Sequence, residues 1–110
     1  MNVWVQQLRK GLAEFGVLAV LEQEDMHGYA VLQRLALMPT MALTESAVYP
    51  LLSRLREGGF IESRMEKSLT GPPKRIYTLT APGRERLAAM RGYWMELCGD
   101  LNHLNGGKLS

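Results

Sequence analysis

Basic side chains gather in one stretch of the sequence. Between Arg54 and Arg75 stand six basic residues against three acidic ones, namely Arg54, Arg56, Arg64, Lys67, Lys74 and Arg75 against Glu57, Glu62 and Glu66. The stretch therefore carries +3, whereas the whole 110-residue chain carries only +2. Clustered lysine and arginine side chains bind nucleic-acid phosphates, and the affinity they give falls steeply with salt. The local charge makes nucleic acid a candidate partner, although any single side chain here could simply be solvated.

A second set of residues could bind an apolar ligand or another helix. Near the C-terminus, apolar residues recur at alternating gaps of three and four: Leu87, Met90, Trp94, Leu97, Leu101 and Leu104. A heptad seam of this kind packs against another helix, and glycines along it disfavour an isolated coiled coil, so we expect a partner subunit. Trp94 on this seam is either a packing residue or a platform for a planar apolar or cationic compound. Trp4 could join it across the interface.

The remaining reactive side chains argue against catalysis and metal binding. The chain has one cysteine, Cys98, and two histidines; Cys98 and His103 are five residues apart and do not share a helix face. We find no phosphate-binding glycine loop and no motif set for a Ser/His/Asp triad. We therefore expect no enzyme, no metal and no cofactor. The single cysteine favours a reducing cytoplasm, and no apolar run approaches the roughly 18 residues of a membrane span.

The helices that would position these residues follow from apolar spacing and from caps. Spacings of three and four predict helices over residues 4–22 and 29–38, separated by a polar break at residues 22–28. Thr44 is a good N-cap for a third helix, which Gly58-Gly59 ends. Pro50 removes a backbone hydrogen bond from that helix, so we expect a local distortion there.

Two strands and a last helix complete the prediction. Residues 60–66 and 75–80 predict short strands, joined by a loop rich in glycine and proline. Thr80 caps the last helix, with Pro82 in its first turn. The resulting order is that of a winged helix-turn-helix, a mainly α fold with a small β-hairpin. We predict a DNA-binding domain at residues 1–80 and a dimerisation helix at residues 81–110, within one structural unit.

Several motifs resemble those of the PadR-like transcriptional regulators. They are Met26-His27-Gly28-Tyr29, Ser46-Ala47-Val48-Tyr49-Pro50-Leu51-Leu52-Ser53-Arg54-Leu55, Gly58-Gly59-Phe60-Ile61-Glu62 and Gly71-Pro72-Pro73-Lys74-Arg75-Ile76-Tyr77-Thr78-Leu79-Thr80. The resemblance implies a homodimer built through the first and last helices, which binds a DNA operator and usually represses a neighbouring gene. The single last helix is similar to that of a subgroup with multidrug-responsive members. In those members a tryptophan lines a flat pocket at the dimer centre, and Trp94 stands at the matching place.

Three sets of site residues follow from the patterns and the resemblance together. For double-stranded DNA we predict Ser46, Tyr49, Ser53 and Arg54 on the third helix and Lys67, Lys74 and Arg75 on the wing. For a small planar apolar ligand we predict Trp94, Trp4 and Met90. For the homodimer we predict Leu8, Leu12, Phe15, Leu87, Leu97 and Leu101.

One departure from the family pattern leaves an alternative open. Many relatives enter the third helix with glycine-serine-leucine, whereas this chain has Thr44-Glu45-Ser46-Ala47. The charge of Glu45 would oppose DNA phosphate. The alternative hypothesis is therefore a winged-helix protein-interaction module that does not bind DNA.

Overall fold

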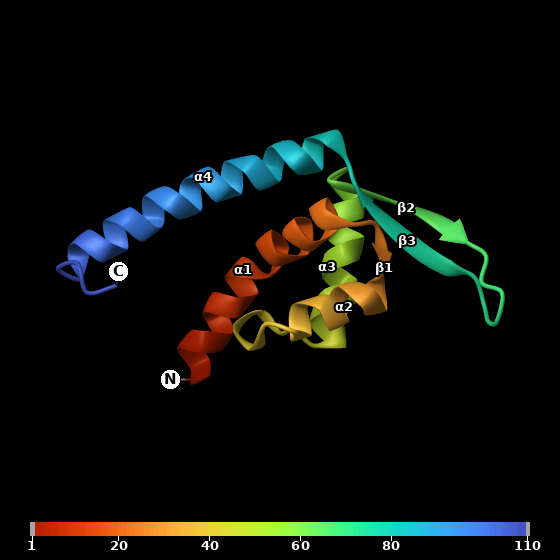
Figure 1. Ribbon diagram of the computed structural model, residues 1–110, viewed down its shortest axis with the longest axis horizontal. Helices are drawn as coiled ribbons and strands as arrows, with labels where there is room; N and C mark the ends of the chain where they lie inside the picture. Colours follow the sequence, from red (N-terminus) through yellow and green to blue (C-terminus); the bar gives the residue numbers. More distant parts are fainter. Residues whose placement is uncertain (1, 110) are drawn as a thin grey trace.

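The computed structural model describes residues 2–109, which form a mainly helical fold with a small antiparallel sheet. The elements are α1 (Asn2–Gln23), β1 (Met26–His27), α2 (Gly28–Ala36), the 3-10 helix η1 (Pro39–Met41), α3 (Glu45–Glu57), β2 (Ile61–Glu66), β3 (Lys74–Leu79) and α4 (Ala81–Leu104). The β2–β3 hairpin and the free end of α4 extend from the helical body in opposite directions (Figure 1). The molecule therefore measures 56 × 30 × 21 Å. The predicted winged-helix architecture is confirmed.

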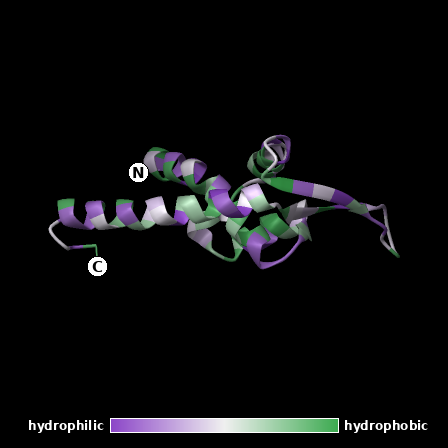
Figure 2. Cartoon of the chain, turned by 90° about the horizontal axis from the view of Figure 1, so that it is seen from above, coloured by the Kyte–Doolittle hydropathy of each residue, from purple (hydrophilic) through white to green (hydrophobic). Residues whose placement is uncertain are grey.

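One apolar core holds α1, α2, α3, the sheet and the start of α4 together. Its largest fully buried side chains are Leu18, Leu21, Leu35, Leu52, Ile61 and Leu87. Each such side chain stabilises the fold by about 1.5–3 kcal/mol relative to an exposed position. The core therefore fixes α3 and the hairpin relative to each other. Hydrophobic residues also continue along α4 beyond this body (Figure 2).

Both ends of α3 follow the sequence signals. Thr44 is the N-cap residue, although its hydroxyl pairs with Ser46 Oγ at 2.9 Å rather than with a backbone N–H. At the other end Gly59 has φ +81°, a left-handed conformation that glycine adopts without steric cost. The Phe60 N–H then donates to the Leu55 carbonyl at 3.0 Å. The helix continues through Pro50 between these two ends.

Two short elements were not predicted. β1 lies in the segment that we expected to be a polar break, and it pairs with β3 through Met26↔Tyr77 and His27↔Ile76. Two residues are too few to show an alternating pattern, so only the pairing reveals this strand. α2 ends at Ala36, two residues earlier than predicted, and Pro39 then opens η1. Proline suits the first position of a helical turn because its missing N–H has no partner there.

The start of α4 is fixed to the end of α3. Thr80 caps α4 as predicted, since its hydroxyl accepts from the Gly83 N–H at 3.1 Å, and it also donates to the Gly59 carbonyl at 2.7 Å. A Cβ at Gly83 would overlap the carbonyl oxygen of Phe60, so this close approach requires glycine. The direction in which α4 leaves the body is therefore set by backbone contacts.

No helix in residues 2–109 is long and apolar enough to cross a membrane.

Candidate nucleic-acid interface and apolar groove

The outer face of α3 carries the side chains predicted to contact DNA. Ser46, Tyr49, Ser53 and Arg54 are all exposed, whereas Val48, Leu51, Leu52 and Leu55 of the same helix are buried. The 13-residue helix is roughly 20 Å long, a length that a DNA major groove admits. Glu45 in its first turn is also exposed and lies at the positive end of the helix dipole. α3 therefore offers a polar surface with one acidic residue, Glu45, in its first turn and another, Glu57, at its last position.

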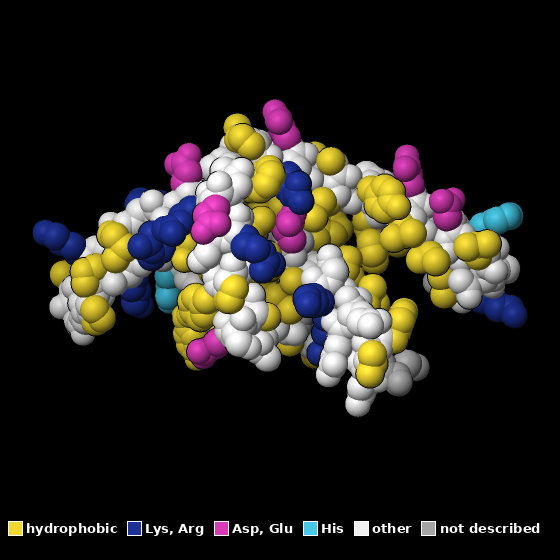
Figure 3. All heavy atoms as spheres, turned by 180° about the vertical axis from the view of Figure 1, so that it is seen from behind, with side chains coloured by type: hydrophobic (Ala, Val, Ile, Leu, Met, Phe, Trp, Pro, Cys, Tyr) yellow, Lys and Arg dark blue, Asp and Glu magenta, His cyan; other side chains and the backbone are white. Residues whose placement is uncertain are grey.

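The hairpin carries the predicted wing cations on its exposed end. Lys74 pairs with Glu66 in the β2–β3 register, so Lys67, the next residue after β2, lies at the same end of the hairpin. Lys67 and Lys74 form no hydrogen bond or ion pair within residues 2–109. Arg75 donates to Ser63 Oγ at 2.8 Å. These cations are exposed and available to a partner, and Lys and Arg side chains are seen along the hairpin in Figure 3.

Part of the basic stretch is neutralised inside the chain. Arg64 lies 3.3 Å from Asp25 and 3.7 Å from Glu66, and it also donates to Thr78 at 3.0 Å. These contacts tie the hairpin to the segment before α2. Arg64 is therefore a structural residue of the wing, whereas the unpaired lysines further along carry the charge that faces solvent.

Tyr77 and Tyr49 differ in exposure. Tyr77 is buried under the wing and is a packing residue. Tyr49 is exposed beside α2. Partial burial, followed by the negative charge of Glu45, raises the pKa of the Tyr49 hydroxyl. A tyrosine hydroxyl is protonated at neutral pH even at its ordinary pKa, so the Tyr49 hydroxyl can donate a hydrogen bond.

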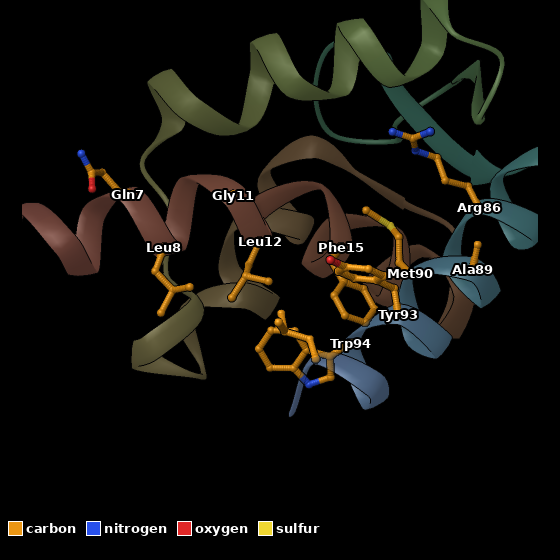
Figure 4. Close-up of a pocket in the computed structure, with 11 residues that line it drawn as sticks. Gln7, Leu8, Gly11, Leu12, Phe15, Arg86, Ala89, Met90, Tyr93 and Trp94 are labelled. Atoms are coloured by element: carbon orange, nitrogen blue, oxygen red, sulfur yellow. The ribbon is translucent and has the colours of Figure 1, made fainter. Parts of the chain in front are cut away.

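A groove runs between α1 and α4. It has a volume of about 580 Å³, and the side chains that face each other across it are Leu8, Leu12 and Phe15 of α1 and Met90, Tyr93, Trp94 and Leu97 of α4. Figure 4 shows Leu8, Leu12 and Phe15 on the side of α1 that faces Trp94. The rings of Phe15 and Trp94 meet edge to face, with centroids 6.3 Å apart and planes at 68°. The notch between the two helices, with yellow hydrophobic side chains along it, is visible in Figure 3.

A smaller hollow lies on the other side of the Phe15–Trp94 contact. It measures about 310 Å³ and is lined by both rings together with Leu35, Met38 and Met41. The two aromatic rings therefore form a wall shared by two apolar spaces. This position gives Trp94 more open apolar surface than a fully packed core residue has.

Most of the residues that we predicted for ligand binding and dimerisation line the groove between α1 and α4, and three do not. Met90, Trp94, Leu8, Leu12, Phe15 and Leu97 line it. Trp4 is exposed near the start of α1 and does not line it, and Leu87 is buried in the chain's own core. Leu101 lies further along α4, beside Trp94 and Cys98.

Tyr93 was not predicted, although it borders the groove. It stands next to Trp94 in the sequence and just outside the strict heptad seam. A helix that packs on a broad surface uses a wider apolar stripe than a heptad seam, and this rule would have included Tyr93.

Two ion pairs join α4 to α1 alongside the groove. Arg86 pairs with Glu14, and Arg91 donates to Glu22 at 2.8 and 3.1 Å. The hydrogen bonds from Arg91 hold the pKa of Glu22 below its usual value, and the hydrogen bond to Glu14 raises the pKa of Arg86. Exposure of the seam rises beyond these pairs, from 0% at Leu87 to 40% at Leu101 and 79% at Leu104. The distal half of α4 therefore has an uncovered apolar face.

Metal chemistry has no visible site in the described part of the chain. Residues 2–109 contain no cluster of three or more His, Cys, Asp or Glu side chains that could hold a metal ion. Cys98 is a free, exposed thiol on α4.

Comparison with known proteins agrees with this architecture. The model of the transcriptional regulator PadR-like family matches residues 17–89. The chain is similar to the PadR-like transcriptional regulator from Bacillus cereus, with 30% identity, a TM-score of 0.81, and coverage of 92% of this chain and 98% of that one. A PadR family regulator from Eggerthella lenta shares 30% identity with a TM-score of 0.80, over 94% of this chain and 86% of that one.

A third solved structure, a PadR-like transcription factor from Bacteroides fragilis, shares 31% identity with a TM-score of 0.78, over 94% of this chain and 99% of that one. Comparison with curated protein sequences finds no match. The helices, the wing and the exposed α3 define a winged-helix protein. Because the family model covers more than half of its length, the chain belongs to the PadR-like family of transcriptional regulators.

Proposed function

We propose that this chain is a homodimeric, sequence-specific DNA-binding regulator that represses transcription and is released by a small planar apolar ligand. The observation that carries DNA binding is the continuity of α3 and the wing. Tyr49 of α3 and Lys74 and Arg75 of β3 border the same hollow, so the helix and the wing present one surface. In winged-helix proteins the third helix enters the major groove and the wing contacts the backbone.

A salt series tests DNA binding directly. We expect the chain to bind the duplex upstream of its own gene, with an affinity that falls linearly on a log–log plot against salt. Lys74→Gln and Arg75→Gln should each weaken binding and lower the slope. The matched control is Lys108→Gln, which removes an exposed charge from the C-terminal tail and should leave both unchanged. Absence of duplex binding at low salt would overturn the proposal.

Dimerisation is supported by the uncovered apolar face of α4 and the groove beside it. Leu97, Leu101 and Leu104 continue the seam beyond the part that the chain's own core covers. A second copy is the proposed occupant because a heptad seam matches another helix of the same kind. We further propose the division suggested by the sequence, with a DNA-binding domain at residues 1–80, whose first helix also contacts the partner subunit, and a dimerisation helix at residues 81–110. The proposed place of action is the cytoplasm, a reducing compartment that suits the free thiol of Cys98.

A ligand role is supported by the size and chemistry of the groove. Its 580 Å³ falls within the range of about 300–1,000 Å³ typical of small-molecule sites, and two aromatic rings meet in its wall. Planar compounds stack on such rings, and planar cations gain cation–π attraction.

Tryptophan fluorescence tests the ligand role with an internal control. Proflavine, a planar aromatic cation, should quench the Trp4→Phe variant, in which only Trp94 emits. Trp94→Phe, in which only Trp4 emits, should show no saturable quenching. Saturable quenching of equal strength in both variants would exclude Trp94 as the platform.

Glu45 favours one competing function, a protein-interaction module without DNA binding. Its carboxylate is exposed in the first turn of α3, where a DNA phosphate would be repelled. The salt series separates the two functions. Under the module hypothesis, the wing substitutions would not alter DNA affinity more than the Lys108→Gln control does.

A further inference from the structure

A hollow lies where the starts of α2 and of strand β3 meet the side of α3. It has a volume of about 330 Å³ and is lined by His27, Gly28, Tyr29, Tyr49, Lys74, Arg75 and Tyr77. β1 creates this hollow, because its pairing with β3 brings His27 opposite Ile76 and so sets the start of α2 beside the wing cations. The hollow therefore joins residues from three separate parts of the sequence.

The groups around this hollow are free to bind a ligand. The hydroxyls of Tyr29 and Tyr49 and the ammonium of Lys74 form no hydrogen bond within residues 2–109, and all three side chains are exposed. Gly28 allows the Tyr49 ring to lie against the start of α2, since a Cβ there would be 2.6 Å from Tyr49 Cε1. Two hydroxyl donors and a cation thus surround one space.

The chemistry of these groups suits an oxyanion. Lysine and tyrosine are among the side chains that bind DNA phosphates, and such contacts fix the register of a protein on the duplex without reading sequence. Both tyrosine hydroxyls are protonated at neutral pH and can donate to such an oxyanion. Arg75, already held by Ser63, adds a second positive charge at the rim.

We infer that this hollow binds one phosphate diester of the DNA backbone, with Lys74 neutralising its charge and Tyr29 and Tyr49 donating hydrogen bonds. The inference rests on the proposed DNA binding and extends it to Tyr29 of α2, a residue outside the recognition helix and the wing. We call this phosphate-binding hollow the clamp. It would hold the duplex beside α3 and so fix how α3 lies in the major groove of the DNA.

The negative charge of Glu45 acts against this site. It is close enough to Tyr49 to raise the pKa of that hydroxyl. The two cations that line the hollow outnumber Glu45, and Glu66, opposite Lys74 in the hairpin register, is already paired with Arg64, so the local balance still favours an anion. Glu45 would reduce the affinity for phosphate without reversing it.

A double-mutant cycle on a mixed-sequence 30-base-pair duplex tests the clamp. Tyr29→Phe removes only a hydroxyl, so we expect roughly tenfold weaker binding with an unchanged salt slope. Lys74→Gln should weaken binding and reduce the salt slope by about one for each bound protomer. Because both residues hold the same phosphate, the double variant should lose less than the product of the two single losses.

Lys67→Gln is the matched control, since it removes a wing cation that does not line the hollow. In the double variant, the loss of duplex affinity from Lys67→Gln should multiply with the loss from Tyr29→Phe. The clamp would be overturned if the losses of duplex affinity from Tyr29→Phe and Lys74→Gln multiply in the double variant. It would also be overturned if Tyr29→Phe alone loses no affinity. In both cases the wild type would still bind DNA. If the wild type does not bind the duplex at low salt, the proposed function itself fails.

A competition arm separates a backbone phosphate from a free anion. At matched ionic strength, inorganic phosphate should weaken duplex binding by the wild type no more than chloride does. If Tyr29→Phe abolished binding of inorganic phosphate to the DNA-free protein but left duplex affinity unchanged, the hollow would be a site for free phosphate, and the assignment to the DNA backbone would be overturned.

Discussion

The winged-helix body includes the start of α4, and the distal half of α4 forms an arm that extends from it. Both contain the same kind of apolar side chain, which is buried in the body and exposed on the arm. In the body, Leu87 of α4 is fully buried by the rest of the chain. Along the arm, Leu101 and Leu104 repeat the spacing of Leu87 but remain exposed. The spacing of apolar residues therefore shows which face of a helix must be covered, and it does not show whether the same chain covers it. The body is complete in one chain, whereas the arm lacks a covering partner.

The largest expected difference between body and arm is in stability. Leu87→Ala should lower the free energy of unfolding by roughly 2–5 kcal/mol, because it leaves a cavity in a packed core. Leu104→Ala, on the exposed end of the same helix, should change it by no more than about 0.5 kcal/mol at a protein concentration low enough for the chain to be monomeric, because a second copy would cover Leu104 in the dimer. Chemical denaturation at one fixed protein concentration measures both, since a dimer's stability depends on concentration. Equal losses would mean that the arm is packed as tightly as the body.

A charge on the seam should separate the subunits without unfolding the chain. Leu97→Asp places a carboxylate in the apolar groove, and we expect the dimer dissociation constant to rise roughly a hundredfold or more. Met95→Asp is the control, because Met95 is exposed and does not line the groove. Sedimentation velocity over a concentration series checks both variants. A dimer that tolerates Leu97→Asp as well as Met95→Asp would place the interface elsewhere.

Removing a charge from the body should alter DNA binding and leave the arm unaffected. Glu45→Gln removes a carboxylate that opposes phosphate, so we expect duplex affinity to rise about three- to tenfold at low salt. The subunit affinity should stay unchanged. Fluorescence anisotropy of labelled DNA measures the first effect, with Glu96→Gln on α4 as the control. Unchanged or weaker DNA binding by Glu45→Gln would contradict the position proposed for the duplex.

The smallest expected effect concerns the ion pair that joins arm and body. Arg91 lowers the pKa of Glu22 below its usual 4.5, so the pair adds stability above that pH and loses it as the pH falls through the lowered pKa. Thermal melts between pH 3 and 7 should show a slightly steeper acid loss for the wild type than for Arg91→Gln. Identical acid profiles would indicate that this exposed pair contributes nothing to stability.

The sequence predicted the body better than the arm or the small elements. Periodicity and caps located the helices and the hairpin because each signal is local, as with Thr80 and Gly59. β1 was missed because a two-residue strand exists only through its pairing with β3. That pairing also makes the hollow around Tyr29, so no local pattern could have suggested it.

The apolar seam of α4 shows that burial, too, could not be predicted from local sequence signals. Leu87 and Leu101 have equivalent sequence signals, and only the position of α4 against α1 separates them. Trp4 and Trp94 are likewise both tryptophans on amphipathic helices, yet only Trp94 borders the groove. Burial depends on contacts between distant segments, which apolar spacing alone does not specify.

Native mass spectrometry of the chain mixed with duplex DNA from upstream of its own gene would test body and arm together. We predict one complex at low salt, with the mass of the duplex plus two chains of 12.4 kDa each. Free duplex beside free protein, or a complex that holds a single chain, would contradict a dimer that presents two α3 helices to one DNA.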